Sequence, residues 1–401
     1  MGPLLDVTVV FKEAPCVCLR VCYQHEREEA AAARGDSLQT EPSSSSSTAV
    51  GGDHRSTFLP GTAQRRSGAG SGPDPSCRTA AQTGATRNKE KLVIKEAARW
   101  WSGVACSPSV EFACSPCPVC GCECCAVKDY GNLTFEEMVD DELVGRVKSV
   151  RAVGSANQRL SKAVQSVKRD GHTAVVLGGD HSLAIGSIHG HAMAVGELSV
   201  VWVDAHADIN TPVTTPTGNI HGQPVSFLLR ELQSKIPVLP NFSWIKPCVS
   251  AKDLVYIGLR DLDPAEHYIL KLLGVKAFSM SEVDQFGVAR VMEETCAYLS
   301  EKVKKPIHLS YDIDAIDPSV TPATGTPAVG GLTYREGVYI TEHLCQTGLL
   351  SAVDMVEVNP LRGQMEKDVQ STVSTAVDLL LGCFGRRREG NHLSDYSLPE
   401  P

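Results

Sequence analysis

Acidic and histidine side chains follow a short apolar run in the middle of the chain. The β-branched run Leu198–Val203 has the length of a buried strand. Asp204, His206 and Asp208 follow it at alternating positions, and an extended chain turns alternate side chains to one side. Two carboxylates and an imidazole crowded together repel one another or lose hydration, and a bound cation removes that cost. The pattern predicts a metal site; the alternative is a polar turn with capping side chains.

Two further apolar runs end in the same kinds of side chain. His181 follows Thr173–Leu177, and Asp312 and Asp314 follow Pro306–Ser310. The carboxyl ends of parallel strands share one edge of a sheet, where ligands bind, so we expect these side chains to meet. Two histidines and four carboxylates suit two ions with bridging carboxylates, and their oxygen-rich chemistry favours Mn2+ over Zn2+. The predicted metal ligands are His181, Asp204, His206, Asp208, Asp312 and Asp314.

Apolar runs of strand length alternate with segments of helical periodicity over the second half of the chain. In the first such segment, Leu160, Val164 and Val167 fall on one helical face. Alternation of this kind predicts an α/β fold with three α/β/α layers and a mostly parallel sheet. The predicted strands are Thr173–Leu177, Leu198–Val203, Leu254–Leu259, Val275–Ser279, Ile307–Ser310 and Leu350–Glu357. The predicted helices are Gly154–Asp170, Ser182–Ala194, Pro224–Leu232, Glu266–Leu273, Val288–Ser300, Tyr334–Thr347 and Thr372–Phe384.

The overall charge argues against two classes of partner. The 401 residues carry a formal net charge of −9, so the chain has no general attraction for nucleic acid or an anionic membrane. No apolar run approaches the roughly 18 residues of a spanning helix. Lys12 and Glu13 interrupt the apolar N-terminal stretch, which suits neither a signal peptide nor a transit peptide. We therefore predict a cytoplasmic protein.

The first third of the chain differs in composition from the rest. Eleven of the fifteen cysteines lie at or before Cys125, and the same region contains a five-serine run and a tract rich in Gly, Ser, Pro and Arg. Such segments bury too little apolar surface to offset chain entropy, so we predict disorder over most of residues 1–124. Gly51–His54 repeats the letters GGDH without a preceding strand. Four cysteines, Cys114, Cys117, Cys120 and Cys124, match the spacing of iron–sulfur ligands, but Cys125 stands where proline normally follows and no second run exists. We assign neither segment a metal.

Six motifs occur in order along the remaining two-thirds of the chain. They are GGDHS at Gly178–Ser182, DAHADINTP at Asp204–Pro212, GNIHGQPVSFLL at Gly218–Leu229, SYDIDAIDP at Ser310–Pro318, PATGTPAVGGLTYREG at Pro322–Gly337 and EVNP at Glu357–Pro360. Together they resemble the arginases of the ureohydrolase superfamily. The resemblance gives three regions: an extension at 1–124, an arginase-like domain at 125–392 and a polar tail at 393–401. The strand, Gly-rich loop and helix that arginases place before this region are not recognisable, so we expect a sheet without the family's first strand.

The resemblance implies a reaction, a cofactor and an assembly. Arginases hydrolyse L-arginine to L-ornithine and urea through a hydroxide that bridges two Mn2+ ions in each subunit, and they form homotrimers. One ion would be held by His181, Asp204, Asp208 and Asp312. The other would be held by Asp204, His206, Asp312 and Asp314. Asp204 and Asp312 would bridge the two ions.

The resemblance also assigns roles around the substrate. Asp208 would pass a proton to the departing amine, His221 would exchange protons with solvent, and Glu357 would pair with the guanidinium. The remaining contacts would be Thr326 near the guanidinium, Asn210, Thr217 and Asn219 at the α-carboxylate, and Asp263 and Glu266 at the α-ammonium. Thr217 stands where the family usually has serine. Turns and helix caps are the structural alternative for these polar side chains.

Two alternatives to an active arginase remain open. Another ureohydrolase, such as agmatinase, would keep the metal ligands but lack a carboxylate-binding loop, and the sequence TPTGNIHGQP argues against it. The missing first strand raises the other alternative, a catalytically impaired isoform that acts only as a binding partner of intact chains.

Overall fold

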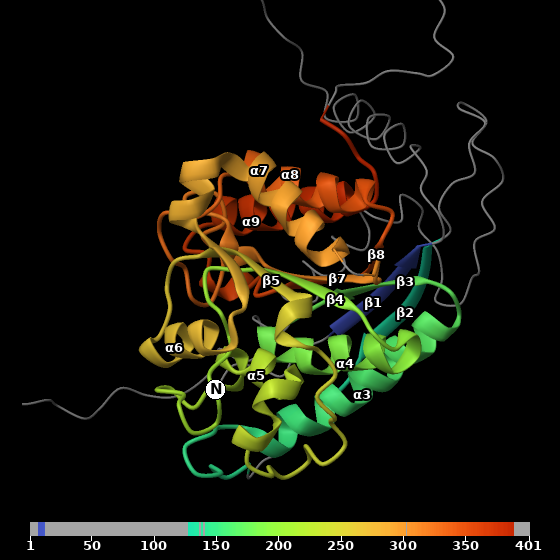
Figure 1. The fold of residues 1–401 in the computed structure, drawn as a ribbon, viewed down its shortest axis with the longest axis vertical. Coiled ribbons are helices and arrows are strands. Elements are labelled where there is room, and N and C mark those ends of the chain that lie inside the picture. Colours follow the sequence, from blue (N-terminus) through green and yellow to red (C-terminus); the bar gives the residue numbers. More distant parts are fainter. Residues whose placement is uncertain (1–6, 13–126, 136–137, 139–140, 302, 389–401) are drawn as a thin grey trace, which may run out of the picture.

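Eight strands form one sheet in the computed structural model, which describes residues 7–12, 127–135, 138, 141–301 and 303–388 (Figure 1). Across the sheet the strand order is β2-β1-β3-β8-β7-β4-β5-β6. In chain order the strands are β1 (Val7–Lys12), β2 (Val127–Leu133), β3 (Thr173–Leu177), β4 (Ser199–Val203), β5 (Leu254–Leu259), β6 (Lys276–Ser279), β7 (Ile307–Asp312) and β8 (Leu350–Val356).

The six strands from β3 to β6 across the sheet are parallel to one another, as the sequence predicted. Every residue of β4, β5 and β7 is buried. The sequences of such strands are nearly continuous apolar runs, because helices cover both faces of a parallel sheet. Their carboxyl ends lie at one edge of the sheet, which brings distant parts of the sequence together.

Strand β1 corrects one prediction. Val7–Lys12 lies between β2 and β3 and pairs antiparallel with both, although the sequence predicted no strand in this segment. Strand β2, which begins at Val127, was also not predicted. Its sequence VKDYGNL mixes charged and polar residues with a glycine, so its strand conformation depends on its sheet neighbour rather than on a local pattern.

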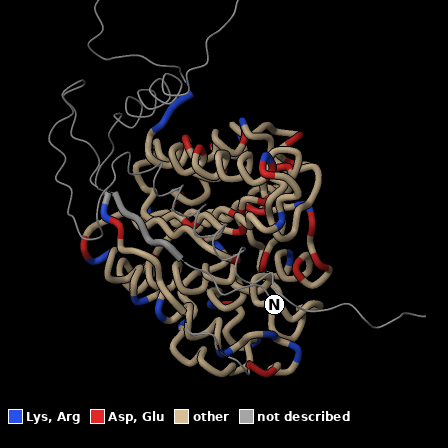
Figure 2. The backbone as a smooth tube through the Cα atoms, turned by 180° about the vertical axis from the view of Figure 1, so that it is seen from behind, with Lys and Arg blue, Asp and Glu red and all other residues tan. Residues whose placement is uncertain are grey.

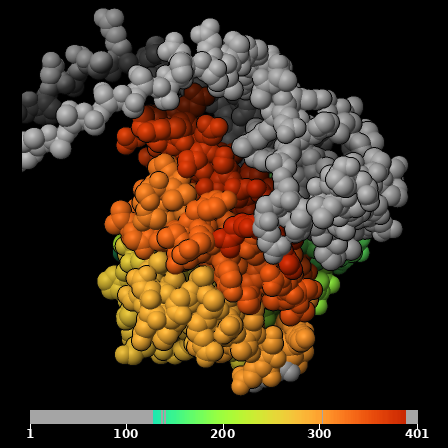
Figure 3. Space-filling view, turned by 90° about the horizontal axis from the view of Figure 1, so that it is seen from above, coloured from blue at the N-terminus to red at the C-terminus, as the bar shows by residue number. Residues whose placement is uncertain are grey.

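Helices cover both faces of the sheet (Figure 1). Helices α7, α8 and α9 lie on one face, which Figure 3 shows from above in orange and red, and α3, α4 and α5 lie on the other. The α-helices of the described region are α3 (Val150–Arg169), α4 (Ala184–Val195), α5 (Pro224–Leu228), α6 (Pro264–Leu273), α7 (Met280–Ser300), α8 (Tyr334–Gln346) and α9 (Glu366–Cys383). The three-layer α/β/α prediction is therefore confirmed.

Helix boundaries differ from the predictions where capping decides them. Helix α7 begins at Met280 instead of Val288, because Ser279 and Glu282 form a capping box at its start. Gly287, with φ 75° and ψ 150°, breaks the helical conformation inside α7, and this break separates the predicted part from the missed part. Helix α5 ends at Leu228, four residues before the predicted end, and a 3-10 helix follows it.

Two patterns singled out in the sequence lie outside the described residues: the GGDH letters of Gly51–His54 and the cysteines of Cys114–Cys125. In the described part, Figure 2 shows Lys and Arg interspersed with Asp and Glu over the outer elements. No helix of that part is both long enough and apolar enough to cross a bilayer.

Candidate metal centre and active site

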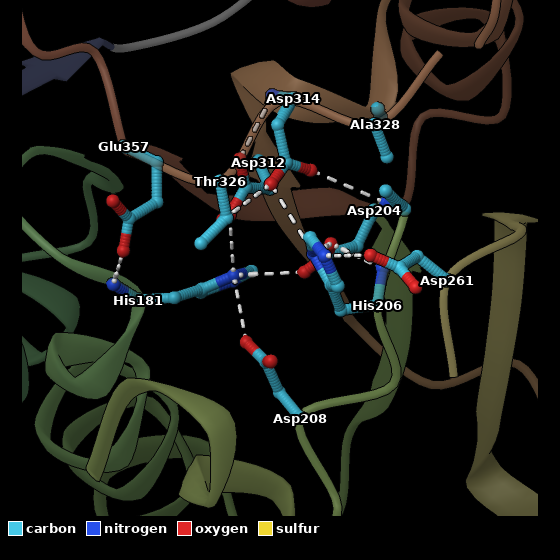
Figure 4. A network of polar contacts seen from close by, with 12 residues as sticks. His181, Asp204, His206, Asp208, Asp261, Asp312, Asp314, Thr326, Ala328 and Glu357 are labelled. Carbon is cyan, nitrogen blue, oxygen red and sulfur yellow. Dashed lines mark hydrogen bonds and ion pairs between the residues drawn. The ribbon is translucent and has the colours of Figure 1, made fainter. Parts of the chain in front are cut away.

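Two groups of side chains that could hold metal ions lie at the carboxyl ends of neighbouring strands (Figure 4). Asp204, His206 and Asp208 follow β4, and Asp312 ends β7, whose next residues include Asp314. His181 begins the 3-10 helix that follows β3. The structure thus brings all six predicted ligands into one network of polar contacts.

The first group is His181, Asp204 and Asp208. The Nδ1 atom of His181 lies 3.0 Å from Asp204 Oδ2, 3.2 Å from Asp208 Oδ2 and 3.1 Å from Asp312 Oδ2. The His181 ring is stacked on the indole of Trp202 at 4.0 Å between centroids. This stacking fixes the ring plane and directs one nitrogen at the three carboxylates.

The second group is Asp204, His206 and Asp314. The Nδ1 atom of His206 lies 3.3 Å from Asp204 Oδ1 and 3.2 Å from Asp314 Oδ2. Asp204 belongs to both groups and offers one oxygen to each histidine, as a bridging ligand must. Asp312 reaches the second group through its Oδ1 atom, which accepts the backbone N–H of Asp314 at 2.8 Å.

One neighbour of the site was missed in the sequence. The Oδ2 atom of Asp261 lies 3.5 Å from the outer nitrogen, Nε2, of His206. Asp261 comes two residues after β5, so it shares the edge to which the predicted ligands belong. The rule that found those ligands, a carboxylate just beyond an apolar strand, applies equally to Asp261.

Burial makes this cluster of carboxylates costly without cations. Burial raises the pKa of Asp312 well above its usual range, and the charges of Asp314 and Asp204 raise it further. Burial and the charge of Asp204 likewise raise the pKa of Asp208 to about 6. Burial alone would lower the pKa of His206, but hydrogen bonds to Asp204 and Asp314 outweigh it and raise that pKa.

The donor set fits two divalent cations. Asp204, Asp312 and Asp314 are at most 3 % exposed, and like charges so close cannot all ionise without a compensating positive charge. Protonated imidazoles can supply that charge, because hydrogen bonds to the carboxylates overcome burial and raise the pKa of His181. Divalent cations would take the place of those protons.

The backbone is in an unfavourable conformation at two site residues. Asp208 has φ 51° and Glu357 has φ 60°, two of only four positive-φ non-glycine residues in the described chain. A side chain in this region costs on the order of 1–3 kcal/mol and persists only where the surroundings impose it. The conformation turns both carboxylates towards His181 (Figure 4).

Glu357 connects the metal ligands to His221. Its Oε1 atom accepts the backbone N–H of His181 at 2.8 Å and lies 3.6 Å from Nδ1 of His221. The hydrogen bond to Glu357 raises the pKa of His221 to about 9, against the opposing effect of burial. The protonated imidazole of His221 is therefore favoured at neutral pH.

The predicted substrate contacts surround the ligands and bond to protein groups. Thr326 donates to Asp314 Oδ2 at 3.1 Å, and Asn210 donates to Asp263 Oδ2 at 2.8 Å. The Oγ1 atom of Thr217 accepts the backbone N–H of Asn219 at 3.2 Å. The Thr217 bond is a turn interaction of the kind expected from the structural alternative, whereas the Thr326 and Asn210 bonds join separate segments of the chain. The substrate roles stay predictions.

Glu266 is buried and accepts two backbone hydrogen bonds. It is 3 % exposed, and its two oxygens accept the backbone N–H groups of Ile209 at 3.2 Å and Asp263 at 3.0 Å. Burial, followed by the charge of Asp208, raises its pKa to about 8. These contacts position the loop that carries Asp208 and Asn210 against the start of α6.

A parallel sheet with a two-metal donor set at its carboxyl edge defines a hydrolase of the metal-dependent α/β class. The family model "Arginase family" matches residues 58–385, and the chain belongs to this family. The protein is thus an arginase-type hydrolase. The family match begins before the six motifs, the first of which is at Gly178–Ser182.

Curated relatives and solved structures agree with this assignment. The chain is 62 % identical over 276 residues to arginase-1 of Homo sapiens, covering 69 % of this chain and 86 % of that protein. It is 61 % identical over 274 residues to the hepatic arginase of Aquarana catesbeiana, covering 68 % and 85 %. The arginase structure from Bacillus caldovelox has a TM-score of 0.57 at 39 % identity and covers 64 % of this chain and 82 % of that one.

Proposed function

We propose that this protein hydrolyses L-arginine to L-ornithine and urea with two Mn2+ ions bound at the carboxyl ends of β4 and β7. The observation that carries the proposal is the pair of His/Asp groups that share Asp204. The proposal is also supported by the family membership of the chain and by relatives named arginase at about 60 % identity.

The proposed ligands are the six side chains predicted from the sequence. His181, Asp204, Asp208 and Asp312 would hold one ion. Asp204, His206, Asp312 and Asp314 would hold the other. Four carboxylates and two imidazoles form a hard, oxygen-rich set that suits Mn2+. Bound metal would lower the pKa of water and supply a hydroxide nucleophile at neutral pH.

The chain's own groups would move the protons. Asp208 lies 3.2 Å from His181 Nδ1, so its carboxylate would stand beside both the bound ion and the reacting group. It would pass a proton to the departing amine. His221, held as a cation beside Glu357, would exchange protons between this site and solvent.

Specificity would come from the polar groups around the site. Glu357 and Thr326 would contact the guanidinium. Asn210, Thr217 and Asn219 would bind the α-carboxylate, and Asp263 with Glu266 would bind or orient groups at the α-ammonium. By the same resemblance we propose a homotrimer, which sedimentation velocity tests.

Urea release by the full-length protein preincubated with Mn2+ tests this function, with L-arginine and agmatine as parallel substrates. We expect turnover of L-arginine, strong loss in Asp208→Asn, and unchanged turnover in Glu366→Gln, an exposed carboxylate at the start of α9. Turnover of agmatine alone would overturn the carboxylate-binding residues. Soluble protein that turns over neither substrate would favour the impaired isoform.

A further inference from the structure

A buried polar network begins at the far side of the His181 ring. While Nδ1 of His181 faces the metal-binding carboxylates, its Nε2 atom lies 2.9 Å from the hydroxyl oxygen of Ser310. The Ser310 hydroxyl in turn donates to Asp354 Oδ2 at 3.3 Å. Ser310 and Asp354 are register partners on the adjacent strands β7 and β8. The sheet itself therefore sets the spacing of this contact.

Asp354 is an unusual carboxylate because it is fully buried and only one of its two oxygens has hydrogen-bond partners among the described residues. It is 0 % exposed, and its Oδ2 atom also accepts the Ser187 hydroxyl at 2.6 Å and lies 2.9 Å from His308 Nε2. Its Oδ1 atom has no hydrogen-bond partner among the described residues. A buried charge with an orphaned oxygen is costly. This cost calls for a role beyond packing.

The hydrogen-bond donors in this network determine which nitrogen of His181 carries a proton. A serine hydroxyl has one hydrogen, and Ser310 gives it to Asp354. The oxygen of Ser310 can then only accept from His181, so the ring proton lies on Nε2. The other ring nitrogen, Nδ1, faces Asp204, Asp208 and Asp312. A metal ion would displace the Nδ1 proton and bind the lone pair, while the Nε2 proton stays hydrogen-bonded to Ser310.

We propose that Asp354 is a positioning residue that acts through Ser310 to hold His181 in the tautomer that binds metal. Among the described residues, Ser310 alone contacts both His181 and Asp354. This role rests on the proposed function, because it concerns affinity for the metal. Without the negative charge, the Ser310 hydroxyl is free to donate to Nε2, and the ring proton moves to Nδ1, where it competes with the ion.

The test is a double-mutant cycle on Mn2+ affinity in the full-length protein. Loss of a partner behind a ligand histidine typically weakens metal affinity 10–100-fold, so we expect Asp354→Asn and Ser310→Ala each to raise the Mn2+ dissociation constant at least about 10-fold. Because Asp354 acts through Ser310, we expect Asp354→Asn to change it less than about 2-fold in the Ser310→Ala background. Equilibrium dialysis measures the affinity, and the visible spectrum of the Co2+-loaded protein reports the ligand geometry.

Ser187→Ala is the matched control. It removes a hydrogen bond from the same Asp354 oxygen but leaves the path to His181 intact, so we expect wild-type Mn2+ affinity and an unchanged Co2+ spectrum. Thermal unfolding of the metal-free variants separates affinity from folding. If Asp354→Asn does not fold, Ser310→Ala must still lose affinity while Ser187→Ala retains it.

Three outcomes overturn the role of Asp354. They are equal Mn2+ affinities in Asp354→Asn and the wild-type protein, additive effects in the double variant, and equal losses in Ser310→Ala and Ser187→Ala. Failure of the wild-type protein to bind Mn2+ overturns the proposed function, and this role falls with it.

Discussion

Neighbouring strands are parallel in one part of the sheet and antiparallel in the other. From β3 to β6 the strands are parallel, and three of them deliver the metal-binding side chains from their carboxyl ends or the turn that follows. Beyond β3, strand β1 runs in the opposite direction between β2 and β3. Its carboxyl end therefore lies at the other edge of the sheet. The two parts therefore have different roles. The parallel strands position the candidate site, and β1 completes the sheet by pairing with β2 and β3.

The largest effect is expected from the residue shared by both metal groups. Asp204→Ala removes a ligand from each group, so turnover should fall at least about 1,000-fold, or about 4 kcal/mol of transition-state stabilisation. Urea release with L-arginine and Mn2+ measures it. Near-normal turnover in this variant would mean that the metal assignment is wrong.

The next effect concerns stability on the other side of the sheet. Val10 is paired with Asp129 of β2 and Val175 of β3, so proline at this position removes a ladder hydrogen bond. Val10→Pro should lower the free energy of unfolding by about 1–3 kcal/mol, measured by urea denaturation. Turnover per folded, metal-loaded molecule should stay unchanged. Equal stability of this variant and the wild-type protein would show that β1 does not support the sheet.

Metal binding should stabilise the native protein through the parallel part alone. Mn2+ at about 100-fold its dissociation constant should raise the free energy of unfolding by about 2.7 kcal/mol for each site. A chelator should reverse the gain, Val10→Pro should keep it, and Asp204→Ala should lose it. Calorimetric melting with and without Mn2+ measures these differences. A gain in Asp204→Ala equal to that of the wild-type protein would place the ions elsewhere.

The smallest effect is a pH dependence within the site. The hydrogen bond to Glu357 raises the pKa of His221 from 6.5 to about 9 in the native state. The protonated pair therefore stabilises metal-free protein below about pH 6.5, and this contribution is lost as the pH rises to about 9. Urea denaturation should show Glu357→Gln less stable than the wild-type protein at pH 6, by a margin that shrinks towards pH 9. A margin independent of pH would exclude this ion pair as its source.

The parallel part of the fold could be predicted from sequence because local pattern and burial agree there. Thr173–Leu177 and Leu254–Leu259 have the same bounds in the sequence prediction and in the structure. The meeting of the six candidate metal ligands was equally accessible to prediction, since the carboxyl ends of parallel strands share one edge of the sheet. Asp261 was missed although it comes two residues after β5 and satisfies the same rule.

The antiparallel side could not be predicted in this way. Val7–Lys12 lies next to β3 only through pairing across a long stretch of sequence, and no local pattern encodes such a partner. Asp354 was hidden for a related reason. It lies inside the apolar run of β8, and its importance emerges only when β7 brings Ser310 beside it.

The position of β1 at the start of the chain has a consequence for biosynthesis. Strand β1 ends at Lys12, but β3 is complete only at Leu177. At about 5–20 residues per second, the ribosome finishes β3 on the order of ten seconds after β1. Strand β1 has neither of its sheet neighbours until β2 is complete at Leu133, and it lacks β3 for the whole interval. An unpaired strand is a template for association with other chains. The yield of folded protein should therefore depend on what shields the nascent β1, even where the finished enzyme does not.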